Sequence, residues 1–361
     1  MAKTSESAPD GREQVAAALA QAVADGTVPG GVVLVGDRDG AWEPVAAGVR
    51  RYGGEAVTPD TRYDIASLTK VVGCLSGLLR LLDGGELALS DPVRRFFSNA
   101  GWFLDPSLGE VTLEALATHT SGLPAWRPLF AEVADRRQGL ARTLQCELED
   151  AGGGYRYSDL GVIVLTAVVE RVAGERLDAF LAREVFAPLG MTRTGYGPLP
   201  EGVPVAATED DGLRGGVLQG TVHDENAWIL GGVSGHAGLF ASAADLLAYG
   251  RAWLRLDAPF ASAAWLRAAL EDRSRGEGPR RGLLWRLAQA DWPFGGACSA
   301  AAYGHTGFTG TSLVVDPEGG WVTVLLTNRV HPSREPGAGI GELRVRVHDA
   351  VARAFGDGGP A

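Results

Sequence analysis

The sequence predicts an α+β fold in which both ends of the chain contribute strands to one antiparallel sheet. Segments with the composition and spacing of strands cluster near the two ends of the chain. The middle of the chain instead carries apolar residues at helical spacing, interrupted by loops. No linker of low complexity separates these parts. We therefore expect terminal helices to flank the sheet and a mostly helical region to be inserted between its two halves.

The N-terminal part predicts a helix followed by two strands. Residues 1–11 are polar and are expected to form a flexible tail. Residues 12–24 carry apolar side chains at helical spacing, which predicts an amphipathic helix. The segment GGVVLVGDRDGAWEPVAAGVRRYG that follows is typical of two strands joined by a turn near Asp37–Gly40.

The C-terminal part predicts a second hairpin and a closing helix. The segment TSLVVDPEGGWVTVLLTNRV has the pattern of two strands, with turn residues at positions 316–320. A helix is expected over about 341–355. In the middle of the chain, the apolar runs VVGCLSGLLRLL and GVIVLTAVVERVAG predict two buried helices.

These elements suggest a multi-domain αβ organisation. Residues 12–75 and 231–356 are expected to form the sheet domain, and residues 76–230 an inserted, mainly helical domain. Residues 1–11 and 357–361 are the expected flexible tails. Because clefts form readily where such parts meet, the seam between them is the expected place for a functional site.

Composition excludes several classes of partner. The chain has 361 residues, of which 45% are hydrophobic, enough to bury a large core. Its net charge of -11 disfavours nucleic acid and anionic membranes as partners. No apolar run is long enough to span a bilayer and no signal peptide is recognised, so we expect a cytoplasmic protein. The composition does not predict the oligomeric state.

No metal or cofactor site is expected. The three cysteines, Cys74, Cys146 and Cys298, have neither metal-ligand spacing nor a disulfide pattern. Three well-separated histidines, His119, His223 and His236, also lack helical ligand spacing. We expect His119 and His236 to lie in loops that line the cleft. No P-loop and no dinucleotide-binding fingerprint is present.

Ser67 and Lys70 form the first candidate catalytic pair. They are three residues apart at the start of a predicted helix, so they share one face of it. A serine hydroxyl becomes a good nucleophile only when a neighbouring base takes its proton, and a lysine can be that base if its pKa falls. The chain has only two lysines, Lys3 and Lys70. Arginine supplies charge elsewhere but cannot act as a base.

A structural interpretation of the same residues is a helix N-cap at Ser67. A capping box would place Glu or Gln three residues later, where this chain has Lys70. A cation in the first turn also opposes the helix dipole. The pair therefore suits catalysis better than capping.

Tyr157 is the second candidate. It directly precedes a predicted apolar helix, within the segment Tyr155-Arg156-Tyr157-Ser158-Asp159. A phenol close to Lys70 could pass a proton between the nucleophile and the leaving group. The alternative is a core tyrosine, with Ser158 or Asp159 capping the helix.

The third candidate segment is the glycine-rich run GHTGFTG over residues 304–310. Glycines at the edge of a strand let the backbone come close to a ligand. The amide of Phe308, together with the amide of Ser67, could form an oxyanion hole. The alternative is an ordinary glycine-rich turn.

In this order, the three segments resemble the motifs of the serine β-lactamase and penicillin-binding protein superfamily, and most closely its class C branch. The resemblance implies a β-lactamase/transpeptidase-like fold. It also implies that Ser67 is acylated, that Lys70 is its partner and that Tyr157 is the motif tyrosine. His305-Thr306-Gly307 would replace the substrate-binding Lys-Thr-Gly strand.

Further segments extend the resemblance over about residues 12–356. These are HTSGLP, GGELALSDPVRRFF and GGVSGHAGLFASAADLLAYGRAWL. The stretch VHDENA over residues 222–227 resembles a subgroup of bacterial class-C-like hydrolases. The run His223-Asp224-Glu225-Asn226 could close over the pocket or form a plain polar turn.

Two substrate-binding positions depart from the family pattern. Asp159 stands where class C β-lactamases have asparagine, and it could pair with Lys70 and raise the pKa of that lysine. His305 stands where the family often has lysine. A histidine with a pKa near about 6.5 is mostly neutral at cytoplasmic pH, so the strand would lack a fixed charge for anionic substrates.

Together these features predict a serine hydrolase that works through a Ser67 acyl-enzyme. A carboxylesterase or small-amide hydrolase fits both departures best. The first alternative is a β-lactamase or a D-alanyl-D-alanine carboxypeptidase, and the second is a non-catalytic, ligand-binding homologue. The expected partner is in each case a small ester, amide or β-lactam-like molecule.

Overall fold

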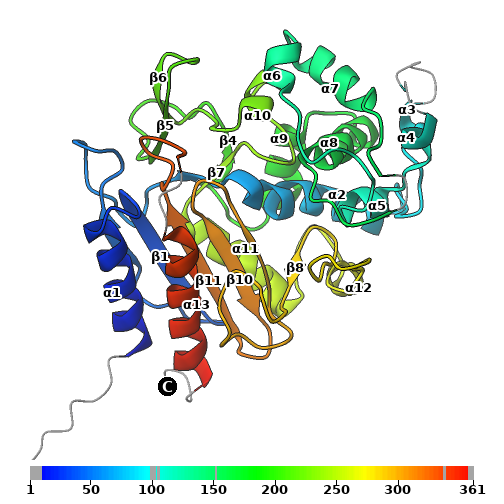
Figure 1. Ribbon diagram of the computed structural model, residues 1–361. Coiled ribbons are helices and arrows are strands. Elements are labelled where there is room, and N and C mark those ends of the chain that lie inside the picture. Colours follow the sequence, from blue (N-terminus) through cyan, green and yellow to red (C-terminus); the bar gives the residue numbers. More distant parts are fainter. Residues whose placement is uncertain (1–9, 98–102, 104–105, 151–152, 336–338, 357–361) are drawn as a thin grey trace, which may run out of the picture.

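The computed structural model describes residues 10–97, 103, 106–150, 153–335 and 339–356 of the chain. Figure 1 shows a six-stranded sheet covered by helices, with a mostly helical part beside it. The predicted α+β class is confirmed, including the sheet built from both ends of the chain. None of the described helices has the length and apolar character needed to cross a membrane.

The six-stranded sheet is antiparallel, with the strand order β2-β1-β11-β10-β9-β8. Its strands are β1 (Gly30–Gly36), β2 (Val45–Gly48), β8 (Arg286–Leu287), β9 (Tyr303–Thr306), β10 (Ser312–Asp316) and β11 (Trp321–Thr327). The pair β1 and β11 joins opposite ends of the chain, with Val33 opposite Leu325. Both predicted hairpins are present, as β1–β2 and β10–β11.

Helices cover both faces of this sheet, so every residue of β1 is buried. Val33 and Val35 pack with α1 (Gly11–Ala24) and α13 (Ile340–Gly356) on one face. Val32 and Leu34 belong to the core on the other face, which contains α11 (Ala243–Arg255). Burial of one such aliphatic side chain contributes about 1.5–3 kcal/mol to stability, which is why a strand this apolar becomes central.

The predicted terminal helices are α1 and α13, which lie side by side in Figure 1. Asp10 caps α1 by accepting a hydrogen bond from the amide of Glu13 at 2.7 Å. The helix therefore starts at Gly11, inside the stretch expected to be a tail. Residues 1–9 and the expected C-terminal tail, 357–361, lie outside the described residues.

The part beside the sheet is mostly helical and is centred on α8, which is buried along most of its length. Its helices are α2 (Ser76–Asp83), α3 (Arg94–Phe97), α4 (Pro106–Glu110), α5 (Leu113–Ala117), α6 (Leu129–Glu132), α7 (Arg136–Leu144), α8 (Asp159–Ala173), α9 (Leu177–Leu181), η3 (Ala182–Phe186) and α10 (Glu225–Ile229). A further helix, α12 (Ala263–Ala269), packs on α2. The hairpin of β5 (Ala207–Asp211) and β6 (Gly216–Gln219) also falls within the predicted insertion. The domain boundaries themselves stay a prediction.

A three-stranded sheet connects segments that are distant in sequence, in the order β3-β7-β4. These strands are β3 (Tyr63–Asp64), β4 (Gly195–Tyr196) and β7 (Leu239–Ala241). Asp64 lies opposite Phe240. The chain enters the Ser67 turn directly after β3 and passes His236 directly before β7, so this small sheet positions both residues.

Candidate active site

Ser67 lies on a tight turn between β3 and a long buried helix. The turn is the 3₁₀ segment η1 (Ala66–Leu68), followed by the π-helical turn η2 (Lys70–Leu75) and then by α2. Ala66 has a φ of 45°, a left-handed conformation that costs a non-glycine residue on the order of 1–3 kcal/mol. Asp64 offsets this cost, because its Oδ1 accepts a hydrogen bond from the Ala66 amide at 2.8 Å. Strained turns and π-helical turns both recur at functional sites.

Lys70 is fully buried, and its amine contacts three acceptors. Nζ donates to Ser67 Oγ at 2.9 Å and to the His236 carbonyl at 3.1 Å. It also lies 2.7 Å from Asp159 Oδ1 and 5.0 Å from the centre of the Tyr157 ring. The structure therefore brings Ser67, Lys70 and Tyr157 together, as the sequence predicts.

The surroundings of Lys70 favour its charged form. Burial alone lowers the pKa of the amine, but Asp159 and Tyr157 outweigh it, and the net shift of the pKa is upward. Nζ donates two hydrogen bonds, to Ser67 Oγ and to the His236 carbonyl, and forms an ion pair with Asp159 Oδ1. Lys70 is thus an ammonium ion in the resting state. The sequence analysis raised this pairing, because Asp159 stands where class C β-lactamases have asparagine.

Tyr157 is held at the start of α8 by its neighbours. Ser158 caps α8 by accepting a hydrogen bond from the Gly161 amide at 3.0 Å. The Ser158 amide donates to His119 Nδ1 at 3.2 Å, and the His119 ring lies 4.6 Å from the Tyr157 ring. Burial, then the charge of Arg281, lowers the pKa of His119 well below its usual range. His119 is therefore a neutral support behind Tyr157 and not part of the cavity surface described below.

The glycine-rich segment lies against the nucleophile turn. A Cβ at Gly307 would collide with Thr311 Oγ1 and with the Ile65 carbonyl, so only glycine permits this approach. The segment brings Phe308 to the same cavity as Ser67. The role of the Ser67 and Phe308 amides as an oxyanion hole stays a prediction.

His305 is a neutral residue within this segment. Its Nδ1–H donates to the Thr306 carbonyl at 2.8 Å. Burial, followed by the charges of Arg281 and Lys70, lowers the pKa of His305 well below its usual range. The effect of this histidine on the choice of substrate stays a prediction.

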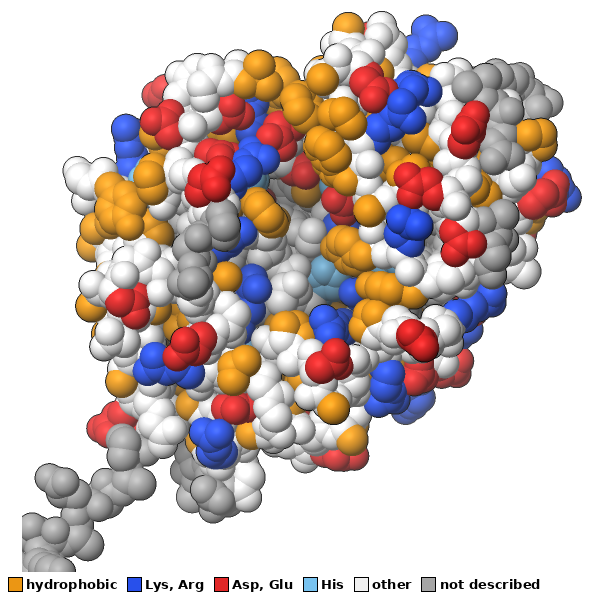
Figure 2. Space-filling model, viewed as in Figure 1, with side chains coloured by type: hydrophobic (Ala, Val, Ile, Leu, Met, Phe, Trp, Pro, Cys, Tyr) orange, Lys and Arg blue, Asp and Glu red, His pale blue; other side chains and the backbone are white. Residues whose placement is uncertain are grey.

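Ser67 opens into a cavity of about 290 Å³. Ala66, Ser67, Tyr157 and Asp159 form one side of this cavity. His223, Asp224, Glu225 and Arg334 also line it, with His236, Ala237, Trp126 and Phe308 between them. These residues come from both the predicted sheet domain and the predicted helical insertion. Figure 2 shows a hollow near the middle of this face of the molecule.

A second cavity, of about 220 Å³, shares Tyr157 with the first. Its wall includes His305, Thr306 and the two arginines Arg281 and Arg286. Within the described part of the chain, neither arginine has an ion-pair partner. Burial, followed by the charge of Arg281, lowers the pKa of Arg286. The sequence analysis missed this cationic cavity, because nothing marks these two arginines among 33 basic residues.

His236 and Asp224 hold the carbonyl that binds Lys70. His236 Nε2 lies 2.9 Å from Asp224 Oδ1, and its Nδ1 lies 2.7 Å from Ser234 Oγ. Although burial opposes ionisation, His236 and the Ala227 amide lower the pKa of Asp224 well below its usual range. Both ring nitrogens of His236 are thus used to fix its backbone beside Lys70. His236 lines the cleft, as the sequence analysis predicts.

Asp64 is a further residue that sequence reasoning missed. Its Oδ2 accepts a hydrogen bond from the His223 amide at 2.7 Å, while its Oδ1 holds Ala66. Burial raises the pKa of this carboxyl group. Asp64 therefore joins the nucleophile turn to the segment 222–226, and no local sequence pattern marks it.

Metal binding finds no support in the described residues. They contain no group of three or more His, Cys, Asp or Glu side chains placed to hold an ion. His223 and His236 each bind a carboxylate instead, those of Glu209 and Asp224.

The chain matches the Beta-lactamase family over residues 15–344. A relative from Escherichia coli O157:H7, provisionally named a D-alanyl-D-alanine carboxypeptidase, is 32% identical over 355 residues, covering 86% of this chain and 81% of the relative. The N-acetylmuramyl-L-alanine amidase of Bacillus subtilis (strain 168) is 30% identical over 309 residues, covering 75% of this chain and 68% of the relative.

Solved structures with low identity share the fold. A class C β-lactamase from Rhodobacter sphaeroides superposes with a TM-score of 0.75 at 20% identity, covering 95% of this chain and 99% of that one. EstCE1, a hydrolase with promiscuous acyltransferase activity, superposes with a TM-score of 0.74 at 22% identity, covering 95% of this chain and 98% of that one. With the family match and these relatives, the chain belongs to the Beta-lactamase family of serine hydrolases.

Proposed function

We propose that the protein hydrolyses an amide bond through an acyl-enzyme on Ser67, and that the amine it releases is an amino acid or a short peptide. One observation carries this proposal. Ser67 Oγ lies 2.9 Å from Lys70 Nζ in a cavity that Tyr157 shares with a second, cationic cavity.

The cationic cavity supports an amino-acid leaving group. Arg281 is buried and Arg286 is half-buried, neither forms an ion pair within the described residues, and a substrate carboxylate could pair with them directly. In the proposed mechanism Tyr157 protonates the leaving nitrogen, so the leaving group would lie on the Tyr157 side. Both curated relatives also carry the name of an enzyme that cleaves an amide bond at alanine.

The ion pair between Lys70 and Asp159 suggests a two-step proton route. As Ser67 Oγ attacks the carbonyl carbon, its proton passes to Lys70 Nζ while Lys70 passes one of its own to Asp159 Oδ1. Asp159 becomes a carboxylic acid and Lys70 remains an ammonium ion. The proton then returns through Lys70 and the Tyr157 hydroxyl to the leaving nitrogen as the C–N bond breaks.

Water completes the cycle by attacking the acyl carbonyl. The water proton follows the same residues in reverse, and Ser67 Oγ recovers a proton from Lys70 as the acyl group leaves. In both halves the amides of Ser67 and Phe308 stabilise the oxyanion. Lys70 serves as a relay and not as a neutral base, because its ordinary state here is charged.

A carboxylesterase is the second candidate. The neutral ring of His305 leaves the motif strand without a charge beside the reacting carbonyl, which suits an uncharged ester. β-Lactam hydrolysis is the third, and it needs the same acylation of Ser67.

A substrate panel tests the proposal. It compares N-acetyl-D-alanyl-D-alanine, its L-alanine isomers, the C-terminally amidated forms, a short-chain nitrophenyl ester and nitrocefin. We expect the free-carboxylate dipeptides to give the highest kcat/KM, and amidation to raise KM. Turnover of the ester alone would establish the second candidate, and turnover of nitrocefin alone the third. Absence of any acylation of Ser67 would leave a ligand-binding homologue.

A further inference from the structure

The loop that joins β9 to β10 carries the Phe308 amide, which the proposed function assigns to the oxyanion. We call residues 307–311 the motif loop. The peptide unit between Gly307 and Phe308 is trans, so its carbonyl and its N–H point in opposite directions. Whatever binds the Gly307 carbonyl therefore sets the direction in which the Phe308 N–H points.

Arg344 binds that carbonyl from the C-terminal helix α13. Its Nη2 donates to the Gly307 carbonyl at 2.8 Å and to the Thr311 carbonyl at 3.1 Å. The Gly307 amide donates to the same Thr311 carbonyl at 2.8 Å, so the guanidinium closes the neck of the motif loop. The Gly310 amide also donates to the Gly307 carbonyl, at 3.1 Å. A hydrogen bond from a charged donor is roughly twice as strong as a neutral one, so Arg344 dominates this pair of donors.

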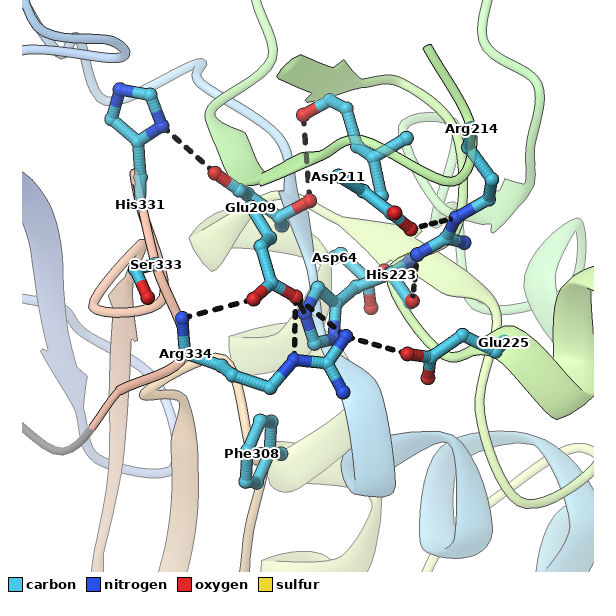
Figure 3. Close-up of polar contacts among 12 residues, drawn as sticks. Asp64, Glu209, Asp211, Arg214, His223, Glu225, Phe308, His331, Ser333 and Arg334 are labelled. Carbon is cyan, nitrogen blue, oxygen red and sulfur yellow. Dashed lines mark hydrogen bonds and ion pairs between the residues drawn. The ribbon is translucent and has the colours of Figure 1, made fainter. Parts of the chain in front are cut away.

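The other end of the peptide unit is free for a ligand. Within the described residues, the Phe308 N–H has no hydrogen-bond acceptor, although the residue borders the Ser67 cavity. The Phe308 ring is held separately, because it stacks on His223 with 5.8 Å between ring centres and lies 4.7 Å from the Arg329 guanidinium. Figure 3 shows Phe308 beside the cluster that contains His223 and Arg334.

The motif loop is also fixed to the nucleophile turn. Thr309 Oγ1 donates to the Asp64 carbonyl at 2.7 Å, and Thr311 Oγ1 donates to the Ile65 carbonyl at 3.1 Å. These contacts set the distance between the loop and Ser67 but do not involve the Gly307–Phe308 peptide unit. Glycine permits many backbone conformations, so the tilt of this peptide depends on the donors to its carbonyl.

Arg344 has no counter-charge that would explain its place in the fold. Within the described residues it forms no ion pair, and its buried Nε has no hydrogen-bond partner. Burial, followed by the charge of Arg329, lowers the pKa of Arg344 to about 10, so the guanidinium stays charged at neutral pH. An unpaired, partly buried cation is costly, and a negative charge that forms nearby would offset this cost.

We propose that Arg344 is a positioning residue that orients and polarises the Phe308 N–H toward the oxyanion through the Gly307 carbonyl. The proposal rests on the proposed function, in which the amides of Ser67 and Phe308 hold that oxygen. Linked hydrogen bonds polarise one another, so the bonds on both sides of the peptide unit strengthen as the oxyanion forms. Arg344 does not line the cavity, so its loss should lower the rate of acylation and leave KM unchanged.

The test compares two acylating esters that differ in one atom, 4-nitrophenyl acetate and its thiono analogue with C=S in place of C=O. In each, Ser67 Oγ bonds to the acyl carbon as 4-nitrophenolate leaves, and the release of nitrophenolate measures acylation. Sulfur is a weak hydrogen-bond acceptor, so the thiono ester gains little from the two amides.

We expect Arg344→Gln to slow acylation by the oxo ester roughly tenfold at saturation, less than the 10²–10³-fold cost of removing an oxyanion donor. The thiono ester should be slowed much less, so the ratio of the two rates falls by nearly the same factor. Arg344→Lys keeps the charge without the planar fork, so the ratio should fall only about threefold.

Arg329 offers a matched control on the same loop. It is half-buried like Arg344, forms no ion pair within the described residues and donates from Nε to the Phe308 carbonyl at 3.0 Å. That carbonyl belongs to the next peptide unit, so Arg329→Gln should leave the oxo-to-thiono ratio unchanged. Arg346→Gln, at an exposed position of α13, should leave both rates unchanged.

Two outcomes would overturn the proposal. They are an unchanged ratio in folded Arg344→Gln or Arg344→Lys, and an equal fall of the ratio in Arg344→Gln and Arg329→Gln, which would trace the effect to net charge. Thermal melts followed by circular dichroism would show that each variant is folded. Either outcome would leave the proposed function standing, whereas failure of both esters to acylate the unaltered protein would remove the proposed function as well.

Discussion

The two sides of the Ser67 cavity use charge in opposite ways. On the nucleophile side, the side chain of Lys70 is 0% exposed and its partner Asp159 is 20% exposed. Elsewhere on the wall of this cavity, Arg334 is 38% exposed and is shared by the two glutamates Glu209 and Glu225. A buried charge that loses its one partner is costly, whereas a half-exposed one is compensated by water. We therefore expect the loss of one residue to cost more beside Lys70 than around Arg334.

The largest effect is expected from Lys70→Arg on the nucleophile side. Arginine keeps the positive charge but cannot give up a proton, so the relay to Asp159 stops. We expect kcat for every substrate to fall by roughly 10⁴-fold. Steady-state kinetics would measure this loss, and Lys3→Arg, at the only other lysine of the chain, is the control. Appreciable activity in Lys70→Arg would mean that Lys70 does not carry the proton.

Asp159→Asn tests whether the carboxylate is the final proton acceptor. The amide cannot accept the proton, so the relay predicts a fall in kcat of about 10²-fold at every pH. If Lys70 instead acts directly as the base, Asp159→Asn should increase activity at low pH. Without the Asp159 charge the raised pKa of Lys70 would fall, so a lysine acting directly as base would work at lower pH. A pH–rate profile that keeps its height and moves to lower pH would contradict the relay.

Arg286→Gln tests the cationic cavity beyond Tyr157. The loss of one guanidinium should raise KM for free-carboxylate dipeptides about tenfold, which corresponds to about 1.4 kcal/mol. The preference over the C-terminally amidated substrates should shrink by the same factor. Arg280→Gln, at a neighbouring arginine that pairs with Asp272 outside this cavity, is the control. An unchanged preference would show that the carboxylate binds elsewhere.

The smallest effect concerns acid stability. Burial keeps the pKa of His305 low in the folded chain, while the unfolded chain takes up its proton near pH 6.5. The free energy of unfolding therefore falls as the pH drops below about 6.5, by up to about 1.4 kcal/mol per pH unit for one proton. His305→Gln should remove this one-proton slope in urea titrations between pH 7 and 5. Identical slopes would contradict a neutral His305.

Glu209, which pairs with Arg334, should not contribute to that slope. Glu209 has a pKa that is lowered by folding, so its contribution is complete above its ordinary pKa of 4.5 and is lost only at lower pH.

Local patterns in the sequence were sufficient for much of this account. Strand spacing predicts β1, β10 and β11, and helical spacing predicts α1, α2, α8 and α13, because these elements bury continuous apolar faces. The Ser67 and Lys70 pair is also local, since helical geometry alone brings residues three apart together. The motif order then linked Tyr157 and His305 to the same family.

The remaining contacts join residues that no local pattern relates. Asp64 and His223 are 159 residues apart, and Glu209 and Arg334 are 125 apart. The cationic cavity depends on where Arg281 and Arg286 lie relative to Tyr157, which only the packed structure shows. Charged residues are usually solvated, so their sequence positions alone do not single out a site.

The most direct test of the account is intact-protein mass spectrometry after exposure to a fluorophosphonate probe. We predict one adduct per chain, which disappears in Ser67→Ala and persists in Ser234→Ala, where the serine is buried beside His236. Persistence of the adduct in Ser67→Ala, or no adduct on the unaltered protein, would contradict a nucleophilic Ser67.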